Sequence, residues 1–218
     1  MKFLYTLRFR LLFLYLLTIV IPTVILIFTM PSYYQRIIID DEKASTQNTL
    51  ETLSRDIDTY LEDLDRLTST PYYDQKFMEA LRLRANNQND NSTDLEKYKA
   101  DQDIDYTMTN YLQNTRDDIL TTILVTNDGT PFVTNKISAL SRINPDYDFS
   151  RQKWYREADE ANGKVVYTST HPQDYLSISS DNQVFSVARI IKDPVTQKRL
   201  AFIMADADYN ILENIFNS

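Results

Sequence analysis

Aromatic, acidic and basic side chains occur in the second half of the sequence at spacings that could form a ligand pocket. Aromatic faces can stack on the C–H surfaces of a small solute, while carboxylate and guanidinium groups hold its hydroxyl groups. This combination suits a small polar ligand, and a sugar more than an amino acid. The candidate ligand-binding residues are Tyr147, Arg151, Trp154, Tyr155, Tyr167, Asp174 and Asp206.

Several of these side chains also have a purely structural interpretation, which the sequence leaves open. Trp154 and Tyr155 could belong to the apolar core, and Asp206 could cap the end of a strand. Arg189 lies in the middle of an apolar run, so it either reaches solvent or meets a buried acid. A structural role for Arg189 is the stronger of the two interpretations.

Residue types that catalyse reactions are scarce. His171 is the only histidine, and because it precedes Pro172 we expect it in a loop rather than at a catalytic centre. Asp206 and Asp208 lack the neighbouring histidine or further acids that a metal site needs. We therefore predict no catalytic residue, no metal and no cofactor. One alternative from another class is a membrane-anchored hydrolase that uses Asp174, Asp206 and His171.

The composition excludes further classes. The chain has no cysteine, so neither a disulfide nor a thiolate metal site can form. Its two glycines, Gly129 and Gly163, are too few for a glycine-rich phosphate loop. All 31 acidic residues follow position 39, and the net charge is −8, which argues against a nucleic-acid partner.

The candidate residues lie in a part of the chain that reads as an antiparallel sheet. The run 119–126 is β-branched, Asn127-Asp128-Gly129 suits a hairpin turn, and 131–134 returns. A helix over 151–161 ends at Asn162-Gly163. Further strands are expected at 164–168, 183–191 and 199–205, with turns at 179–182 and 193–194. With helices to one side of this sheet, the fold class is α+β.

Helices precede the sheet. Leu50, Leu53, Ile57, Tyr60, Leu64 and Leu67 form one apolar stripe of helical spacing. The stripe predicts a long stalk helix that either docks on the core or pairs in a homodimer. Residues 72–118 read as helices, with a polar loop at 85–93 and a cap at Ser92, Thr93 or Asp94.

The N-terminal segment predicts a membrane anchor. Residues 11–35 carry no charge, which is enough to cross about 30 Å of hydrocarbon. Lys2, Arg8 and Arg10 precede the span, so the positive-inside rule places the N-terminus in the cytoplasm. A cleaved signal is the weaker alternative because its apolar core is shorter. We expect a cytoplasmic N-terminus at 1–10, a transmembrane helix at 11–31, a stalk at 32–70 and an extracellular module at 71–218.

Taken together, these motifs resemble a known family. The anchor, the stalk, the N-D-G hairpin, W-Y-R-E-A at 154–158, V-F-S-V-A-R-I-I at 184–191 and a strand ending in aspartate are similar to the extracellular double Cache sensor of YesM-like bacterial sensor histidine kinases. The resemblance implies a PAS-like antiparallel sheet in the membrane-distal Cache module, and a role as the input region of a two-component receptor. It also implies that a second module and a kinase core belong to the complete receptor, so this chain is read as a fragment or truncated product without enzymatic activity. A chemoreceptor or a cyclic-dinucleotide enzyme as the output is the alternative.

The resemblance also bears on the ligand. Amino-acid-binding members of the wider Cache group carry an arginine two residues before the tryptophan and a Tyr-x-Asp after the helix. Here Gln152 occupies the first position, with Arg151 one residue earlier, and Asp174 has no tyrosine two residues before it. Tyr147, Trp154 and Asp206 fit the pattern. These departures lead us to expect a sugar in preference to an amino acid.

Overall fold

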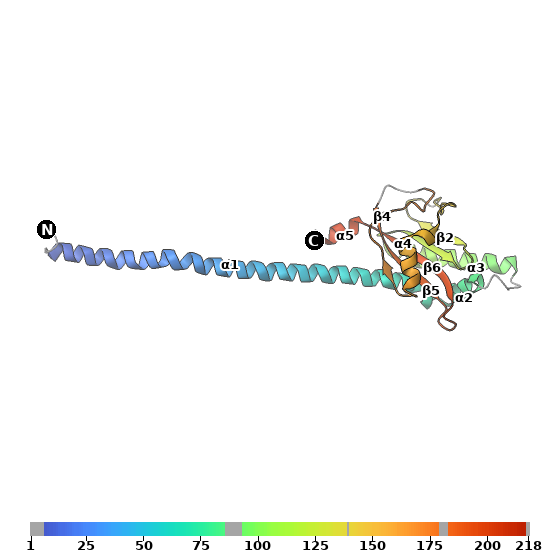
Figure 1. The fold of residues 1–218 in the computed structure, drawn as a ribbon, viewed down its shortest axis with the longest axis horizontal. Helices are drawn as coiled ribbons and strands as arrows, with labels where there is room; N and C mark the ends of the chain where they lie inside the picture. The colour runs from blue at the N-terminus through green and yellow to red at the C-terminus, as the bar shows by residue number, and fades with distance from the viewer. Residues whose placement is uncertain (1–6, 86–92, 139, 179–182, 217–218) are drawn as a thin grey trace. The chain divides into compact units, whose positions relative to one another are not determined.

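The computed structural model describes residues 7–85, 93–138, 140–178 and 183–216. The chain divides into two compact units, Met1–Arg55 and Asp56–Ser218. Helix α1, Leu7–Ser69, contributes to both units (Figure 1). Residues 86–92 of the polar loop predicted at 85–93, and the predicted turn at 179–182, lie outside the described residues.

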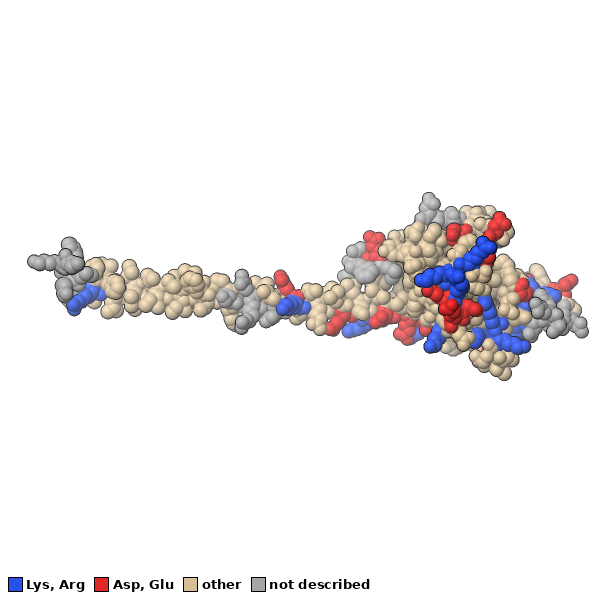
Figure 2. Space-filling view, in the orientation of Figure 1, with Lys and Arg blue, Asp and Glu red and all other residues tan. Residues whose placement is uncertain are grey.

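The first unit contains a helical segment that can span a membrane by its length and composition. Phe9–Pro31 covers 23 residues with a mean hydropathy of 2.8, and its side chains are exposed. Figure 2 shows this segment largely without charged side chains. Pro22 and Pro31 lie inside the helix, as is tolerated in membrane-spanning helices. The segment agrees with a single-pass membrane protein.

The second unit is built on one antiparallel sheet. Its strands are β1 (Ile119–Thr126), β2 (Pro131–Asn135), β3 (Val166–Tyr167), β4 (His171–Pro172), β5 (Gln183–Lys192) and β6 (Arg199–Asp208). The order is β2-β1-β6-β5-β3, and β4 also pairs with β5. The α+β prediction with a PAS-like antiparallel sheet is confirmed.

Local sequence explains the hairpin and the helix ends. At the β1–β2 turn Gly129 has φ 87°, and the Thr126 amide donates to the Thr130 carbonyl over 3.0 Å. Thr93 caps the α3 helix, because its hydroxyl accepts from the Glu96 amide while the Glu96 carboxylate accepts from the Thr93 amide. The predicted hairpin and one of the three predicted caps are therefore confirmed.

One face of the sheet, here called the helix face, carries most of the helices. It is covered by the end of α1, by η2 (Thr70–Tyr73), α2 (Gln75–Ala85), α3 (Asp94–Thr107) and the π-helical η3 (Met108–Gln113). The second half of the predicted stripe docks here, because Tyr60, Leu64 and Leu67 are buried against this core, whereas Leu50 is 61% exposed. Docking on the core therefore accounts for the stripe from Tyr60 onward.

The opposite face, here called the ring face, carries η4 (Phe149–Arg151) and α4 (Lys153–Glu160). Helices thus lie on both faces, which the sequence prediction did not include. A short helix, α5 (Asn210–Phe216), was likewise not predicted. The aromatic side chains packed on this face are Tyr147, Phe149, Trp154, Tyr155, Tyr175 and Phe202.

Candidate functional site

A buried carboxylate lies at the centre of a polar network on the ring face. Asp206 has no exposed surface. Its Oδ2 accepts hydrogen bonds from the Tyr175 hydroxyl at 2.5 Å and from Gln173 Nε2 at 2.8 Å, and its Oδ1 accepts from Ser186 Oγ at 2.7 Å. Three donors therefore satisfy a charge that would otherwise be costly to bury.

Strand register brings these residues together. Asp206 of β6 lies opposite Ser186 of β5 and opposite Thr121 of β1. Side chains at directly opposed positions point to the same face of a sheet. Gln173 enters from the loop after β4 and bridges two of the three, because its Nε2 also donates to Thr121 Oγ1 at 2.9 Å. The site is thus set by three strands and one loop.

Burial dominates the electrostatics of this network. It raises the pKa of Asp206, while the three hydrogen bonds and the nearby His171 act in the opposite direction. Burial also raises the pKa of Tyr175, and the charge of Asp206 adds to that rise. Among the described residues, no lysine or arginine forms an ion pair with Asp206. A positively charged ligand group would supply the missing counter-charge.

His171 joins the network through the hydroxyl of Ser186. Its Nε2 lies 2.9 Å from Ser186 Oγ, and its Nδ1 lies 3.0 Å from the Pro172 carbonyl oxygen. Ser186 therefore links the ring of His171 to the carboxylate of Asp206.

This order of groups does not match a hydrolytic triad. In a Ser-His-Asp triad the histidine stands between serine and acid, whereas here Ser186 stands between His171 and Asp206. The Ser186 hydroxyl is also fully buried, and Asp174 is exposed. The geometry gives the hydrolase alternative no activated nucleophile.

Aromatic rings lie beside the polar network of Asp206. The Trp154 and His171 rings are nearly parallel at 16°, with centroids 6.4 Å apart. Tyr147 meets Tyr175 edge-on at 5.7 Å, and Trp154 lies 5.7 Å from Phe202. Such faces attract a cation as well as apolar groups. The ring face therefore combines a buried acid with an aromatic wall.

Four of the predicted residues contribute to this region. Tyr147, Trp154 and Tyr155 pack in the aromatic cluster, and Asp206 is its buried acid. Tyr155 lies farther along, with its ring 4.8 Å from Phe202 and its hydroxyl accepting from Arg199. The packing of Trp154 and Tyr155 agrees with the structural interpretation as well.

The other three predicted residues are not brought into the network. Arg151 is largely exposed and pairs with Asp148 at 3.1 Å. Asp174 is exposed beside Tyr147, whose pKa is raised by burial first and then by the Asp174 charge. Tyr167 belongs to the opposite face, where its ring lies parallel to Phe185 and its hydroxyl donates to the carbonyl of Leu61 at 3.0 Å.

Gln173, Tyr175, Ser186 and Thr121 were not predicted as site residues. One local signal was present, because Ser186, like Arg189, interrupts the apolar run 184–191 and calls for a polar partner. Thr121 lies between Leu120 and Thr122 in a strand with several threonines, so nothing local marks it. Its role follows only from its register opposite Asp206.

On the helix face, polar contacts join the sheet to the end of α1. Arg189 of β5 forms an ion pair with Asp65, which settles the sequence alternatives in favour of an acid partner. The Tyr60 hydroxyl donates to Asp118 at 2.8 Å, and Arg116 reaches Asp63 at 3.0 Å. Burial lowers the pKa of Arg189. Because β5 carries both Ser186 and Arg189, one strand touches the polar network and α1.

Comparisons with known proteins identify the fold. The sequence matches no family model and no curated protein. The structure is similar to the ligand-binding domain of the Pseudomonas fluorescens chemoreceptor CtaA, solved in complex with L-isoleucine, with a TM-score of 0.52 and 16% identity over 83% of this chain and 63% of that chain. It is also similar to the extracellular domain of vpHK1S-Z8, assigned as a histidine kinase, with a TM-score of 0.54 and 11% identity over 81% and 62%.

Both similarities concern part of the solved domains, since this chain spans less than two thirds of their lengths. At these identities they establish the fold and not the ligand. The chain has the Cache-type fold of ligand-binding sensory domains.

Proposed function

We propose that the chain is a membrane-anchored extracellular sensor of a small molecule and the input region of a YesM-like two-component sensor histidine kinase. It binds the small molecule, transmits the binding event to the rest of the receptor and catalyses no reaction. The observation that carries the proposal is the buried Asp206 network inside the aromatic cluster, on a fold shared with ligand-binding sensory domains. The apolar segment Phe9–Pro31 anchors the sensor with its N-terminus in the cytoplasm.

An amino acid replaces the sugar as our proposed ligand. The chemistry of the ring face supports an ammonium group, because Asp206 lacks a cationic partner among the described residues and Trp154 and Tyr147 offer aromatic faces. The CtaA domain, similar in fold, was solved with L-isoleucine. The ligand carboxylate would need another partner than Arg151, which is exposed and paired with Asp148.

Binding must rearrange the network, since Asp206 has no exposed surface and Tyr175, Gln173 and Ser186 already occupy three of its about four acceptor positions. An ammonium that displaces one of these donors favours a second arrangement of β5 and the loop after β4. The Arg189–Asp65 ion pair then carries a shift of β5 to α1. Pairing of two stalks through the exposed start of the stripe, at Leu50, belongs to the same proposal.

The single tryptophan allows a direct test with the full chain in lipid nanodiscs. Trp154 lies against the network, so its fluorescence reports ligand at this site. We would titrate the twenty amino acids, with glucose, xylose and rhamnose as the sugar arm. We expect a saturable change with at least one amino acid and none with the sugars.

Two variants make the test specific. Asp206→Asn removes the charge and should weaken binding by about 10- to 100-fold. Asp208→Asn is the matched control on the same strand, because Asp208 bonds to the Asn210 amide outside the network. Unchanged affinity in Asp206→Asn, or a response to sugars alone, would refute the proposed site and ligand class.

The chemoreceptor or cyclic-dinucleotide alternative shares this input site. The CtaA similarity is the observation that favours it. Residue 218 lies outside the cell in the proposed topology, so residues 1–218 would replace the first span and first Cache module of a YesM-like kinase, whose remaining second span leads to the kinase core. This chimaera distinguishes the two, because a YesM-like input should make autophosphorylation depend on the amino acid found above. Autophosphorylation that does not respond to the ligand, whichever residue joins the two proteins, would favour the alternative.

A further inference from the structure

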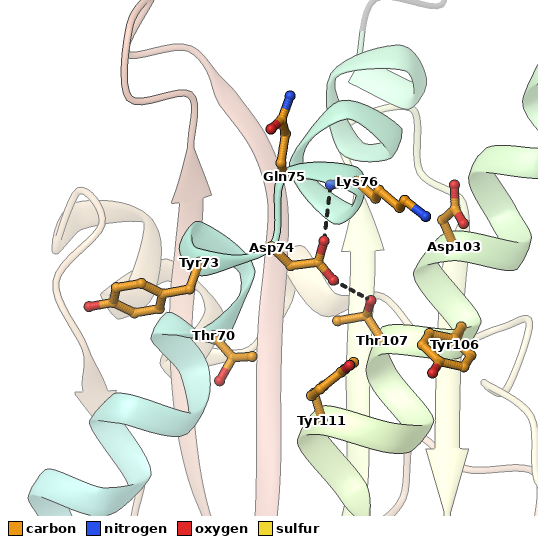
Figure 3. A pocket seen from close by; sticks show the side chains of 9 residues that line it. All are labelled: Thr70, Tyr73, Asp74, Gln75, Lys76, Asp103, Tyr106, Thr107 and Tyr111. Carbon is orange, nitrogen blue, oxygen red and sulfur yellow. Dashed lines mark hydrogen bonds between the residues drawn. The ribbon is translucent and has the colours of Figure 1, made fainter.

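A second hollow lies on the helix face, away from the Asp206 network. Its central part measures about 750 Å³ and lies between η2, the start of α2, and α3 (Figure 3). Two smaller hollows of about 360 and 380 Å³ adjoin it, because the first shares Thr70 and Tyr111 with it and the second shares Lys76 and Asp103. The three adjoining hollows, here called the α2–α3 groove, are lined by residues from the end of α1 to the middle of α2.

Two tyrosine rings line the middle of the groove and are open to solvent. Tyr106 is 60% exposed and Tyr111 is 50% exposed, and their rings meet edge-to-face with centroids 6.1 Å apart. Burying either ring on folding would have been favourable, so their exposure beside a hollow calls for an explanation. A partner that covers these rings would provide it.

The π-helical turn accounts for the pairing of the rings. In a regular α-helix, residues five apart point about 140° away from each other. The wider turn of η3, closed by the Asn114 amide on the Thr109 carbonyl at 3.2 Å, brings Tyr111 round towards Tyr106. Such π-helical segments are frequent at functional sites. The irregularity thus serves the geometry of the groove.

Polar groups in the groove are available for a ligand. Figure 3 shows the Lys76 and Asp103 side chains pointing towards one another, above the two tyrosines. Among the described residues, neither the Lys76 ammonium nor the Asp103 carboxylate has a hydrogen bond or ion pair. Asp74, by contrast, is engaged by the Lys76 amide at 3.0 Å and by the Thr107 hydroxyl at 3.0 Å. One donor and one acceptor without such a bond therefore lie together on one side of the aromatic pair.

We propose that the α2–α3 groove binds a neutral oligosaccharide, independently of the amino-acid site. The exposed rings stack on the C–H faces of sugar units, and Lys76 and Asp103 hydrogen-bond their hydroxyl groups. Three adjoining hollows suit several linked sugar units rather than one. Charges of both signs along it are unsuited to a polyanion, and helical walls offer no strand edge to an extended peptide.

The test is isothermal titration calorimetry on the full chain in lipid nanodiscs, which contain no sugar-headed detergent. The probes are the linear hexasaccharides of β-1,4-glucose, β-1,4-xylose and β-1,4-N-acetylglucosamine. We expect saturable binding of at least one probe. Tyr106→Ala should weaken it roughly fivefold to tenfold through the lost stacking, while Tyr106→Phe retains it.

Tyr98→Ala is the matched control, because Tyr98 is 59% exposed on the same helix but does not line the groove. Trp154 fluorescence should stay unchanged on adding the hexasaccharide, which separates this site from the amino-acid site. The proposal is overturned if no probe binds, or if Tyr98→Ala and Tyr106→Ala weaken binding equally.

Discussion

The two faces of one sheet show how the same strands can serve two purposes. On the ring face, a buried acid is held by neutral donors inside an aromatic cluster, and no lysine or arginine in the described part of the chain pairs with it. On the helix face, Arg189 and Arg116 pair with acids of α1 over a conventional apolar core. The first arrangement holds a carboxylate by hydrogen bonds from neutral groups. The second holds a helix.

The alternation of side chains along a strand makes this division unavoidable. Ser186 and Arg189 are three residues apart on β5, so they point to opposite faces. A movement of β5 at one face therefore reaches the other without a further relay. The comparison predicts that substitutions on the ring face change binding, and those at the Arg189–Asp65 pair change its transmission.

The largest expected effect concerns the apolar packing of the ring face. Phe202 is fully buried beneath Trp154 and Tyr155, so Phe202→Ala should lower the free energy of unfolding by about 3–5 kcal/mol. Urea unfolding followed by Trp154 emission measures it. A loss below about 1 kcal/mol would show that the aromatic cluster is not a packed core.

A smaller effect is expected at the ion pair of the helix face. The Arg189 side chain is only 11% exposed, and Asp65→Ala removes its acidic partner. We expect a cost of about 1–2 kcal/mol, because Asp65 itself is partly exposed. The double variant Asp65→Leu with Arg189→Met should recover much of that loss. It should also bind the amino acid normally, as seen by Trp154 fluorescence. Weakened binding in the double variant would contradict the separation of the two faces.

Asp206→Asn should raise the free energy of unfolding modestly, whereas the two preceding substitutions lower it. Burial raises the pKa of Asp206 in the folded chain above its ordinary value of 3.8. Between pH 3.8 and the raised pKa, the folded chain binds more protons than the unfolded chain. The free energy of unfolding therefore falls as pH rises through that interval. The asparagine variant should lose this dependence and be the more stable protein at pH 7. Melting temperatures between pH 4 and pH 8 test the prediction, and a less stable variant at pH 7 would refute it.

The smallest effect is expected at the β5–β6 turn. The Arg82 guanidinium, with two backbone amides, lowers the pKa of Asp193 to about 2. The pair therefore stabilises the fold above pH 3.8 and loses its contribution as pH falls towards 2. Arg82→Ala should be slightly less stable at neutral pH, with the difference from wild type vanishing in acid. A difference that grows in acid would be inconsistent with this assignment.

Much of the fold could be predicted because its signals are local. The hairpin at Asn127–Gly129 and the cap at Thr93 each follow from a few neighbouring residues. The stalk stripe and the long strands follow from periodicity. The end of the sheet at β3 was less predictable, since only Val166 and Tyr167 pair where a longer strand was expected.

The site could be predicted only in part because its geometry depends on strand register. Tyr147, Trp154 and Asp206 were predicted from their residue types and lie together on the ring face, but Thr121 becomes relevant only once β1 is paired with β6. Tyr167 was misplaced because a single step along a strand changes the face on which a side chain lies.

The central claim is that ligand at Asp206 moves the sheet against the end of α1. Because the chain has no cysteine, spin labels can be placed at Asp58→Cys on α1 and Lys198→Cys on the β5–β6 turn, both exposed sites. Double electron–electron resonance in nanodiscs should show a change in the distance between the two spin labels when the amino acid that saturates Trp154 fluorescence is added. The change should disappear in Asp65→Leu with Arg189→Met, although binding persists. An unchanged distance at saturating ligand in the otherwise native chain would contradict the account.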